Sequence, residues 1–294
     1  MATMLVTPLP SNTGQDVLAA LETVRQALER SNGLGNGRPA RQRIEEHVRW
    51  ATDASRQLRR RISADDIARL VFTRGFYAML EVDLREAAVA SLLLSVETDT
   101  RLEELDAASS ALRAEISRWQ INKVLVVLDT SVYLHDEKIE NLDLGDLLQV
   151  REQPIHILIP MVIVDELDTL KQSGKREIRW RAAYTLAFIN GCLDSATLHG
   201  RVRPEDFSAL AHGGIPRGEI TAEVVLDRPG HNRLPIADDE IVDRALAIQR
   251  IAGRGVHVVT FDTGMQMRAC GQDLTVYKRD QPEEPETTSG TRKT

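Results

Sequence analysis

The stretch VLVVLDTS at residues 124–131 decides how the C-terminal half of this chain folds. Its first five residues are apolar and mostly β-branched, which is typical of a strand buried on both faces of a sheet. Asp129 follows directly, where the strand must end. Apolar runs at 155–159 and 256–260 repeat the pattern, and residues 274–277 form a weaker copy. We therefore expect several buried strands in this half of the chain.

Helical stretches separate these runs, at residues 142–149, 162–173, 178–193 and 239–252. Strands that alternate with helices predict an α/β domain with a central parallel sheet, here over residues 121–278. Residues 204–235 interrupt the alternation. They contain Gly213-Gly214, Pro216 and Pro229-Gly230, and we interpret them as an inserted loop and hairpin with a short strand at 219–226.

The N-terminal part shows no convincing strand before residue 123, and residues 14–120 predict an α-helical bundle domain. The expected pieces are a helix over 15–30, a loop over 31–39, a helix over 41–61, a helix start at 63–66, a densely apolar stretch at 72–96 and a last helix at 102–119. Residues 1–13 are expected to be a flexible leader. Residues 279–294, rich in Pro, Glu, Thr and Ser, are expected to be a disordered tail.

The composition is ordinary for a globular protein, with 42% apolar and 28% charged residues. A net charge of −7 argues against binding nucleic acid through bulk charge. It does not exclude an enzyme whose acids surround a divalent metal. No apolar run can span a bilayer, and two cysteines make no disulfide framework. We expect a soluble, cytoplasmic protein without a membrane partner.

Two aspartates follow predicted strands. Asp129 comes directly after the strand at 124–128, and Asp262 comes shortly after the strand at 256–260. Functional groups of α/β proteins gather at the carboxyl ends of strands, which favours a site here. Aspartate also caps helices and turns, and this alternative stays open for each residue taken alone.

The helices add two further acids. On a helical wheel, Glu166 lies on the flank of the buried stripe of its helix, while the other two acids of that helix face away. In the helix that starts near residue 239, Asp238 lies near the apolar side, and Asp239 and Glu240 point away. Asp238 also occupies the expected N-cap position of this helix, so helix capping is the alternative to a role in the site.

Four inward carboxylates cannot stay ionised together without compensation, which a divalent cation supplies. Mg²⁺ or Mn²⁺ suits an all-oxygen site, activates a bound water and stabilises charge on a phosphate. Asp239 and Asp243 are outside candidates for the metal. Three hydroxyl residues can orient metal-bound waters or satisfy the local backbone: Ser131, Thr260 and Thr263.

Four segments together carry a resemblance to a known family: LDTSVYL at 128–134, IPMVIVDELDTLK at 159–171, LPIADDEIVDRAL at 234–246 and VVTFDTGMQMRA at 258–269. They resemble the PIN-domain nuclease superfamily. The sequence of these segments is more similar to that of larger bacterial PIN-domain proteins, including the PIN portion of PhoH-linked proteins, than to that of the short toxins of the superfamily. The resemblance implies a three-layer α/β/α fold and divalent-metal-dependent cleavage of RNA. The family's acidic positions fall on Asp129, Glu166, Asp238 and Asp262.

Two departures from the family pattern matter. The insert at 204–235 lengthens the interval between the second and third acids, and Asp238 is adjacent to a second aspartate. Two other functions compete with the ribonuclease. One is a non-catalytic RNA-binding or scaffold protein with a PIN fold. The other is an aspartyl-phosphate phosphotransfer domain, for which Lys278 after the last strand is suitably placed, although Glu166 and Asp238 then have no role.

A basic segment follows Glu166, and its candidate RNA-binding residues are Lys171, Lys175, Arg176 and Arg179. These side chains can contact phosphates, and Trp180 can stack on a base. The alternative is a solvated helix face with Trp180 in the core. The helical domain carries no chemical motif but has long apolar stretches, so by analogy we expect it to mediate a homodimer or to bind a partner protein.

Overall fold

The computed structural model describes residues 5–34, 37–83, 85–228 and 231–280. The chain divides into two compact units, Met1–Asn122 with Leu246–Gly255, and Lys123–Ala245 with Val256–Thr294. We call these the helical unit and the α/β unit. No helix in the part of the chain that the structure describes is long and apolar enough to cross a membrane.

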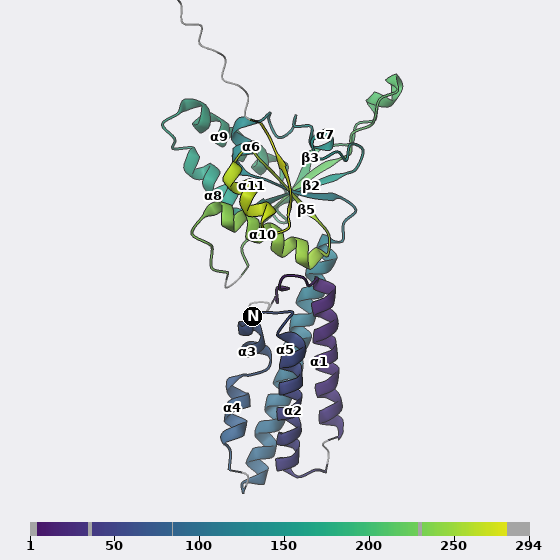
Figure 1. Ribbon diagram of the computed structural model, residues 1–294, viewed down its shortest axis with the longest axis vertical. Helices are drawn as coiled ribbons and strands as arrows, with labels where there is room; N and C mark the ends of the chain where they lie inside the picture. Colours follow the sequence, from purple (N-terminus) through teal and green to yellow (C-terminus); the bar gives the residue numbers. More distant parts are fainter. Residues whose placement is uncertain (1–4, 35–36, 84, 229–230, 281–294) are drawn as a thin grey trace, which may run out of the picture. The chain divides into compact units, whose positions relative to one another are not determined.

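The helical unit has five helices of its own among the described residues (Figure 1): α1 Gly14–Leu34, α2 Ala40–Leu58, α3 Ala64–Leu70, α4 Arg74–Glu81 and α5 Ala87–Trp119. Helix α1 packs against both α2 and α5. Fully buried leucines such as Leu21, Leu58 and Leu105 fill the space between them. The indole of Trp50 donates a hydrogen bond of 3.0 Å to the carbonyl of Val24, which joins α2 to α1.

The boundary expected between residues 96 and 102 does not exist. Helix α5 runs unbroken from Ala87 to Trp119. The boundary between two helices lies earlier, between the end of α4 and the start of α5. The polar residues at 97–101 resemble a loop in the sequence. In the structure, Glu97 and Arg101 are each only 6% exposed, because they pair with each other inside the unit.

This pair fastens α3 and α4 to α5. Glu97 and Arg101 lie 3.2 Å apart. The hydroxyl of Thr73, the N-cap of α4, donates to Glu97 at 2.8 Å, and Arg101 donates to the carbonyl of Arg69 at 2.8 Å. A Cβ atom on Gly75 would lie 2.0 Å from the Glu97 carboxylate, so a larger residue there would displace this buried side chain.

We predict that Glu97→Ala destabilises the helical unit by about 3–5 kcal/mol, because it leaves Arg101 buried without its partner. Denaturant unfolding followed by circular dichroism measures the effect. Glu45→Ala is the matched control, since its ion pair with Arg41 is exposed, and we expect a change below about 0.5 kcal/mol. Equal losses for the two variants would contradict the proposed role of the buried pair.

The predicted leader differs from the structure over its described part. Residues 1–4 lie outside the described residues. Val6 is fully buried, the backbone amide of Leu9 donates to the carbonyl of Arg61 at 2.8 Å, and the side chain of Asn12 donates to the carbonyl of Arg60 at 2.8 Å. These contacts attach the segment to the end of α2.

The α/β unit is built on a six-stranded sheet in the order β3-β4-β2-β1-β5-β6. The strands are β1 Val124–Leu128, β2 Ile155–Pro160, β3 His199–Arg203, β4 Ile220–Val225, β5 Val256–Thr260 and β6 Thr275–Lys278. All neighbours are parallel except β3 and β4. The flanking helices are α6 Thr130–His135, α7 Leu144–Leu147, α8 Met161–Leu170, α9 Arg176–Cys192, α10 Ala237–Ala252 and α11 Thr263–Cys270 (Figure 1). This confirms the predicted α/β fold with its mainly parallel sheet.

The interpretation of residues 204–235 as one insert is wrong in its middle. The strand expected at 219–226 exists as β4, but it lies inside the sheet, buried and parallel to β2, instead of in a separate hairpin. Its other neighbour, β3, was not predicted, because HGRVR is polar and lies at the sheet edge. The excursions are therefore two shorter loops. One contains the 3-10 helix Ser208–His212, and the other leads from β4 to α10.

The predicted tail also begins too early. The amide of Arg279 donates to the carbonyl of Thr260 at 2.8 Å, which continues the sheet pairing. The guanidinium of Arg279 makes two hydrogen bonds, of 2.7 and 2.8 Å, to Asp136 at the end of α6. Residues 281–294 of the predicted tail lie outside the described residues.

Candidate active site

The parallel strands bring the predicted acids to one edge of the sheet. Asp129 follows β1 and Asp262 follows β5, and these two strands are neighbours. Glu166 lies on α8, which follows β2 on the other side of β1. Asp238 lies in the first turn of α10. The carboxyl ends of adjacent parallel strands form the crevice in which α/β proteins place their sites.

Asp129 is 5% exposed and is held by hydroxyl groups. It occupies the N-cap position of α6, yet its side chain makes no capping hydrogen bond. Its carboxylate instead accepts hydrogen bonds from Ser131 and, at 2.8 Å, from Thr260 at the end of β5. Helix capping therefore does not account for this aspartate, and two of the three predicted supporting hydroxyls contact it.

Glu166 is half-buried and accepts a hydrogen bond of 2.6 Å from the hydroxyl of Thr130. Burial raises the pKa of Glu166 above its usual value; the Thr130 bond opposes this, and the charges of Asp129 and Asp238 add to the rise. Sequence reasoning did not single out Thr130. The signal available was a hydroxyl residue directly after Asp129, at the start of the helix that faces α8.

Asp238 lies in the same electrostatic field. Burial raises its pKa first, the charge of Asp129 raises it further, Arg268 lowers it, and Asp262 and Asp239 raise it again. Helix α10 begins at Ala237, so Asp238 is already inside its first turn.

Arg268 of α11, which the sequence did not indicate, stands beside both aspartates of α10. Its guanidinium lies 3.8 Å from Asp238 and donates to Asp239 at 2.8 Å. Asp239, an outside candidate for the metal, is therefore engaged by an arginine. The arginine lies closer to Asp239 than to Asp238.

Asp262 caps helix α11 with its side chain and binds Thr260 with its backbone amide. It is the N-cap of α11, where one carboxylate oxygen accepts from the amide of Met265 at 2.8 Å. Its own amide donates to the hydroxyl of Thr260 at 2.9 Å, which connects it to the group that binds Asp129. Thr263 differs from the expectation, because its hydroxyl accepts from Lys278 at 2.7 Å instead of contacting the acids.

The charges of the four acids act on one another, but their carboxylate oxygens are not gathered closely around one point. No three of them, all within the described residues, bring their oxygens within 4.8 Å of one another. Carboxylates repel when no cation lies between them, and an all-oxygen donor set of this kind suits Mg²⁺ or Mn²⁺. The residues present thus fit a hard divalent cation. Their catalytic role stays a prediction.

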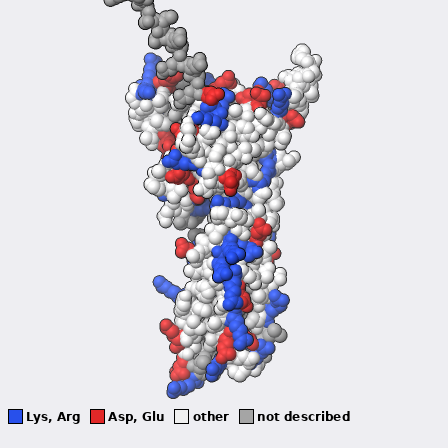
Figure 2. Space-filling model, viewed as in Figure 1, with Lys and Arg blue, Asp and Glu red and all other residues white. Residues whose placement is uncertain are grey.

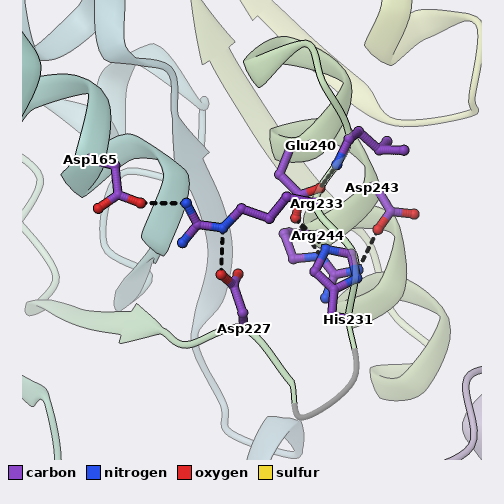
Figure 3. A network of polar contacts seen from close by, with 8 residues as sticks. Asp165, Asp227, His231, Arg233, Glu240, Asp243 and Arg244 are labelled. Carbon is purple, nitrogen blue, oxygen red and sulfur yellow. Dashed lines mark hydrogen bonds and ion pairs between the residues drawn. The ribbon is translucent and has the colours of Figure 1, made fainter.

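A separate polar network anchors the loop that leads into α10 (Figure 3). Arg233 bridges Asp227, at 2.5 Å, and Asp165 of α8. His231 binds Glu240 at 2.7 Å, and Glu240 also accepts from the amide of Leu234 at 2.9 Å. These contacts hold the loop against α8 and α10.

Glu240 corrects the helical-wheel interpretation, which turned it away from the protein. It is 1% exposed, because the loop folds over it and supplies His231 as a partner. Arg244, one turn further along α10, lies 3.3 Å from Glu240 and also pairs with Asp243. Asp243 therefore belongs to this network (Figure 3) and is not among the charges that act on Glu166 or Asp238.

Asp227, His231 and Glu240 place their ligand atoms within 4.8 Å of one another, the geometry of a three-ligand metal group among the described residues. Two guanidinium groups already balance this cluster, since Arg233 contacts Asp227 and Arg244 contacts Glu240. A cation would have to displace them. We interpret the cluster as an ion-pair network that positions the loop.

The predicted RNA-binding residues divide into two pairs. Lys171 is paired with Asp168 at 2.5 Å, and Arg179 donates to the carbonyl of Ser173 at 2.8 Å. Within the described residues, no hydrogen bond or ion pair engages the side chains of Lys175 and Arg176, both exposed at the start of α9. Trp180 is 54% exposed, so the alternative that placed it in the core is wrong.

The mainly parallel sheet with acidic residues at its carboxyl edge agrees with a comparison of the sequence with known families. The sequence pattern of the PIN domain matches residues 126–278, just over half of the chain. The chain therefore belongs to the PIN domain family, whose members are generally nucleases that depend on divalent metal ions.

No curated protein matches the sequence closely enough to count as a relative. A solved structure described as a domain of a functionally unknown protein from Methanocaldococcus jannaschii DSM 2661 is 18% identical to this chain. The match covers 55% of this chain and 95% of that one, with a TM-score of 0.33. A superposition at that score is too loose to bear on fold or function.

We predict that Glu166→Gln stabilises the metal-free protein near neutral pH. The folded-state pKa of Glu166 is raised, so the stability linked to its protonation is present at low pH and is lost as pH rises through that pKa. The variant removes this charge and keeps an acceptor for Thr130. Calorimetry in EDTA should show a rise in Tm of about 1–4 °C.

Added metal should favour the wild type over the variant. Millimolar Mn²⁺ should raise the Tm of the wild type through binding linkage, and it should raise the Tm of Glu166→Gln less. Glu205→Gln, at an exposed position of the same unit, is the matched control and should follow the wild type in both buffers. A wild-type Tm that ignores Mn²⁺ would argue against a cation at these acids.

Proposed function

We propose that the protein is a ribonuclease that hydrolyses RNA phosphodiester bonds with Mg²⁺ or Mn²⁺ held by Asp129, Glu166, Asp238 and Asp262. One observation carries the proposal. Acids from four different elements lie at the carboxyl edge of the sheet, and burial together with the charges of neighbouring acids raises the pKa of both Glu166 and Asp238. Such mutual destabilisation is relieved when a divalent cation binds, and it clusters at functional sites.

The hydroxyl groups give the acids fixed positions. Thr260 and Ser131 orient the carboxylate of Asp129, and Thr130 orients Glu166. When bound, a divalent cation supplies an activated water and stabilises the charge that develops on the phosphate. Arg268 of α11 lies 3.8 Å from Asp238 and supplies a positive charge beside it.

RNA is the proposed substrate, and its contacts must be local. The chain carries a net charge of −7. On the face drawn in Figure 2, positive and negative side chains are interspersed over the α/β unit. Affinity for a phosphate backbone therefore depends on particular basic groups near the site, such as Lys175 and Arg176 at the start of α9.

The aspartyl-phosphate alternative is less well supported. In that alternative Lys278 would contact a phosphoryl group on Asp129, yet its amine is bonded to Thr263 on α11. It also leaves the coupling among Asp129, Glu166 and Asp238 without a function. A non-catalytic scaffold has no need for the hydroxyls that orient Asp129 and Glu166.

We predict that Asp129→Asn abolishes metal-dependent RNA cleavage and leaves the fold intact. The amide keeps the shape of the side chain but removes the charge that binds the cation. Cleavage of labelled RNA with Mn²⁺, compared with EDTA, measures the loss, which we expect to exceed about 100-fold. Asp146→Asn, at an exposed position of α7, is the control and should cleave RNA like the wild type. Asp136→Asn does not serve as a control, because Asp136 pairs with Arg279. Cleavage by Asp129→Asn at the wild-type rate would contradict the proposal.

We further propose that the helical unit pairs with a second copy of the chain. Helices α4 and α5 expose apolar side chains that a lone unit leaves in water: Tyr77, Leu80, Val89, Leu92, Leu93 and Val96. On α5 these side chains follow the three- and four-residue spacing of a helix-packing stripe.

We predict that light scattering finds a dimer that Leu92→Glu, at 65% exposure, converts to a monomer. Burying a charge in the apolar contact is the physical cause. Leu210→Glu, exposed on the 3-10 helix of the α/β unit, is the control and should stay dimeric. A wild type that is monomeric at high micromolar concentration would refute the pairing.

A further inference from the structure

Helix α9 carries a row of three aromatic rings. Trp180, Tyr184 and Phe188 lie four residues apart, on one face of the helix. The ring centroids of Trp180 and Tyr184 are 5.4 Å apart with an angle of 24° between the planes, and those of Tyr184 and Phe188 are 6.4 Å apart at 15°. The three rings form a stacked ladder along α9, which Figure 1 shows beside α8.

The open end of this ladder is Trp180. It is 54% exposed, whereas Trp50 and Trp119 are 6% and 1% exposed. Tryptophan is enriched at binding surfaces, because its ring supplies a large apolar area with a polar edge. Tyr184 stacks on this ring from the next turn of the helix.

Contacts beneath the ladder hold it in place. The hydroxyl of Tyr184 donates to Glu140, so its ring is oriented. Arg181 donates to the carbonyl oxygens of Tyr133, at 2.8 Å, and Asp136, which fixes α9 against the end of α6. The rings therefore form a preorganised surface, and a ligand that stacks on it pays little to order them.

One lysine contacts the rings, and one arginine precedes them on the same helix. The amine of Lys138 lies 4.3 Å from the centroid of Tyr184 and 5.9 Å from that of Trp180. Arg176 precedes Trp180 by four residues and so shares its helix face, and no group in the described part of the chain engages its side chain. Aromatic faces interleaved with free basic groups are the chemistry that binds single-stranded nucleic acid.

We propose that this face of α9 is a base-stacking platform for unpaired bases of an RNA strand, with Trp180 as the stacking ring and Arg176 and Lys138 as phosphate contacts. The inference rests on the proposed ribonuclease function and names its substrate class as single-stranded RNA. Helix α6 starts after Asp129, and its C-terminal carbonyls bind Arg181 of α9, so α9 packs against the helix that begins at the acids. A duplex cannot use the platform, because its bases are already stacked on each other.

The test is a titration of the full chain with a dye-labelled unstructured RNA of about ten nucleotides, in EDTA so that no cleavage occurs; anisotropy of the dye gives the Kd of every variant, and tryptophan emission reports stacking. Trp180 reports the binding, since the other two tryptophans are buried. We expect RNA to quench the emission. Trp180→Ala should abolish the quenching and raise the Kd on the order of 10-fold, and Trp180→Phe should restore most of the affinity without the signal.

Phe207→Ala is the matched control, because Phe207 is 55% exposed elsewhere in the α/β unit, and it should bind like the wild type. A duplex of the same sequence should bind more weakly and quench less. Equal affinity of wild type and Trp180→Ala, no quenching, or equal binding of the duplex would overturn the platform. If a second copy of the chain or a protein partner covered Trp180 instead, RNA would not quench its emission.

These outcomes are separable from those of the proposed function. Binding in EDTA does not depend on catalysis. A wild type that binds and quenches but never cleaves RNA with Mn²⁺ would remove the ribonuclease and leave the platform. A wild type that cleaves RNA while Trp180→Ala binds it equally well would remove the platform and leave the ribonuclease.

Discussion

The burial of several carboxylates near one another at the carboxyl edge of the sheet is the constraint that shapes this part of the α/β unit. The strand ends put Asp129 and Asp262 side by side, and α8 and α10 add Glu166 and Asp238. The fold tolerates this because hydroxyl groups donate to the acids: Thr260 binds Asp129 while accepting from the amide of Asp262. Arg268 supplies a nearby positive charge. The same arrangement that costs stability makes a place for a cation.

The sequence predicted those parts of the fold that one strong signal controls. Buried parallel strands are continuous apolar runs, so β1, β2 and β5 were evident. Strand β3 lies at the edge, has polar residues, and pairs antiparallel, so it lacked that signal. Strand β4 is fully buried, but the glycines and prolines on either side suggested an insert.

The acids show the same limit at the level of single residues. A helical wheel describes one helix and its apolar face, and it was informative for Glu166 on α8. It failed for Glu240, because a loop distant from that face covers this residue and brings His231 to it. Glu97 and Arg101 failed similarly, since a buried ion pair looks like a polar boundary until its partners are known. Contacts between segments that the chain brings together are not encoded in local periodicity.

The bonds of Arg279 define where the folded chain can safely be shortened or joined to something else. Its guanidinium covers the carboxylate of Asp136, whose side chain is 4% exposed, and its backbone extends the pairing beside β5. Helix α6, which Asp136 closes, starts from Asp129 itself. A protein engineer can therefore attach an affinity handle after Asp280 without touching these bonds. A cut before Arg279 would uncover a buried charge at the far end of the helix that carries the first acid.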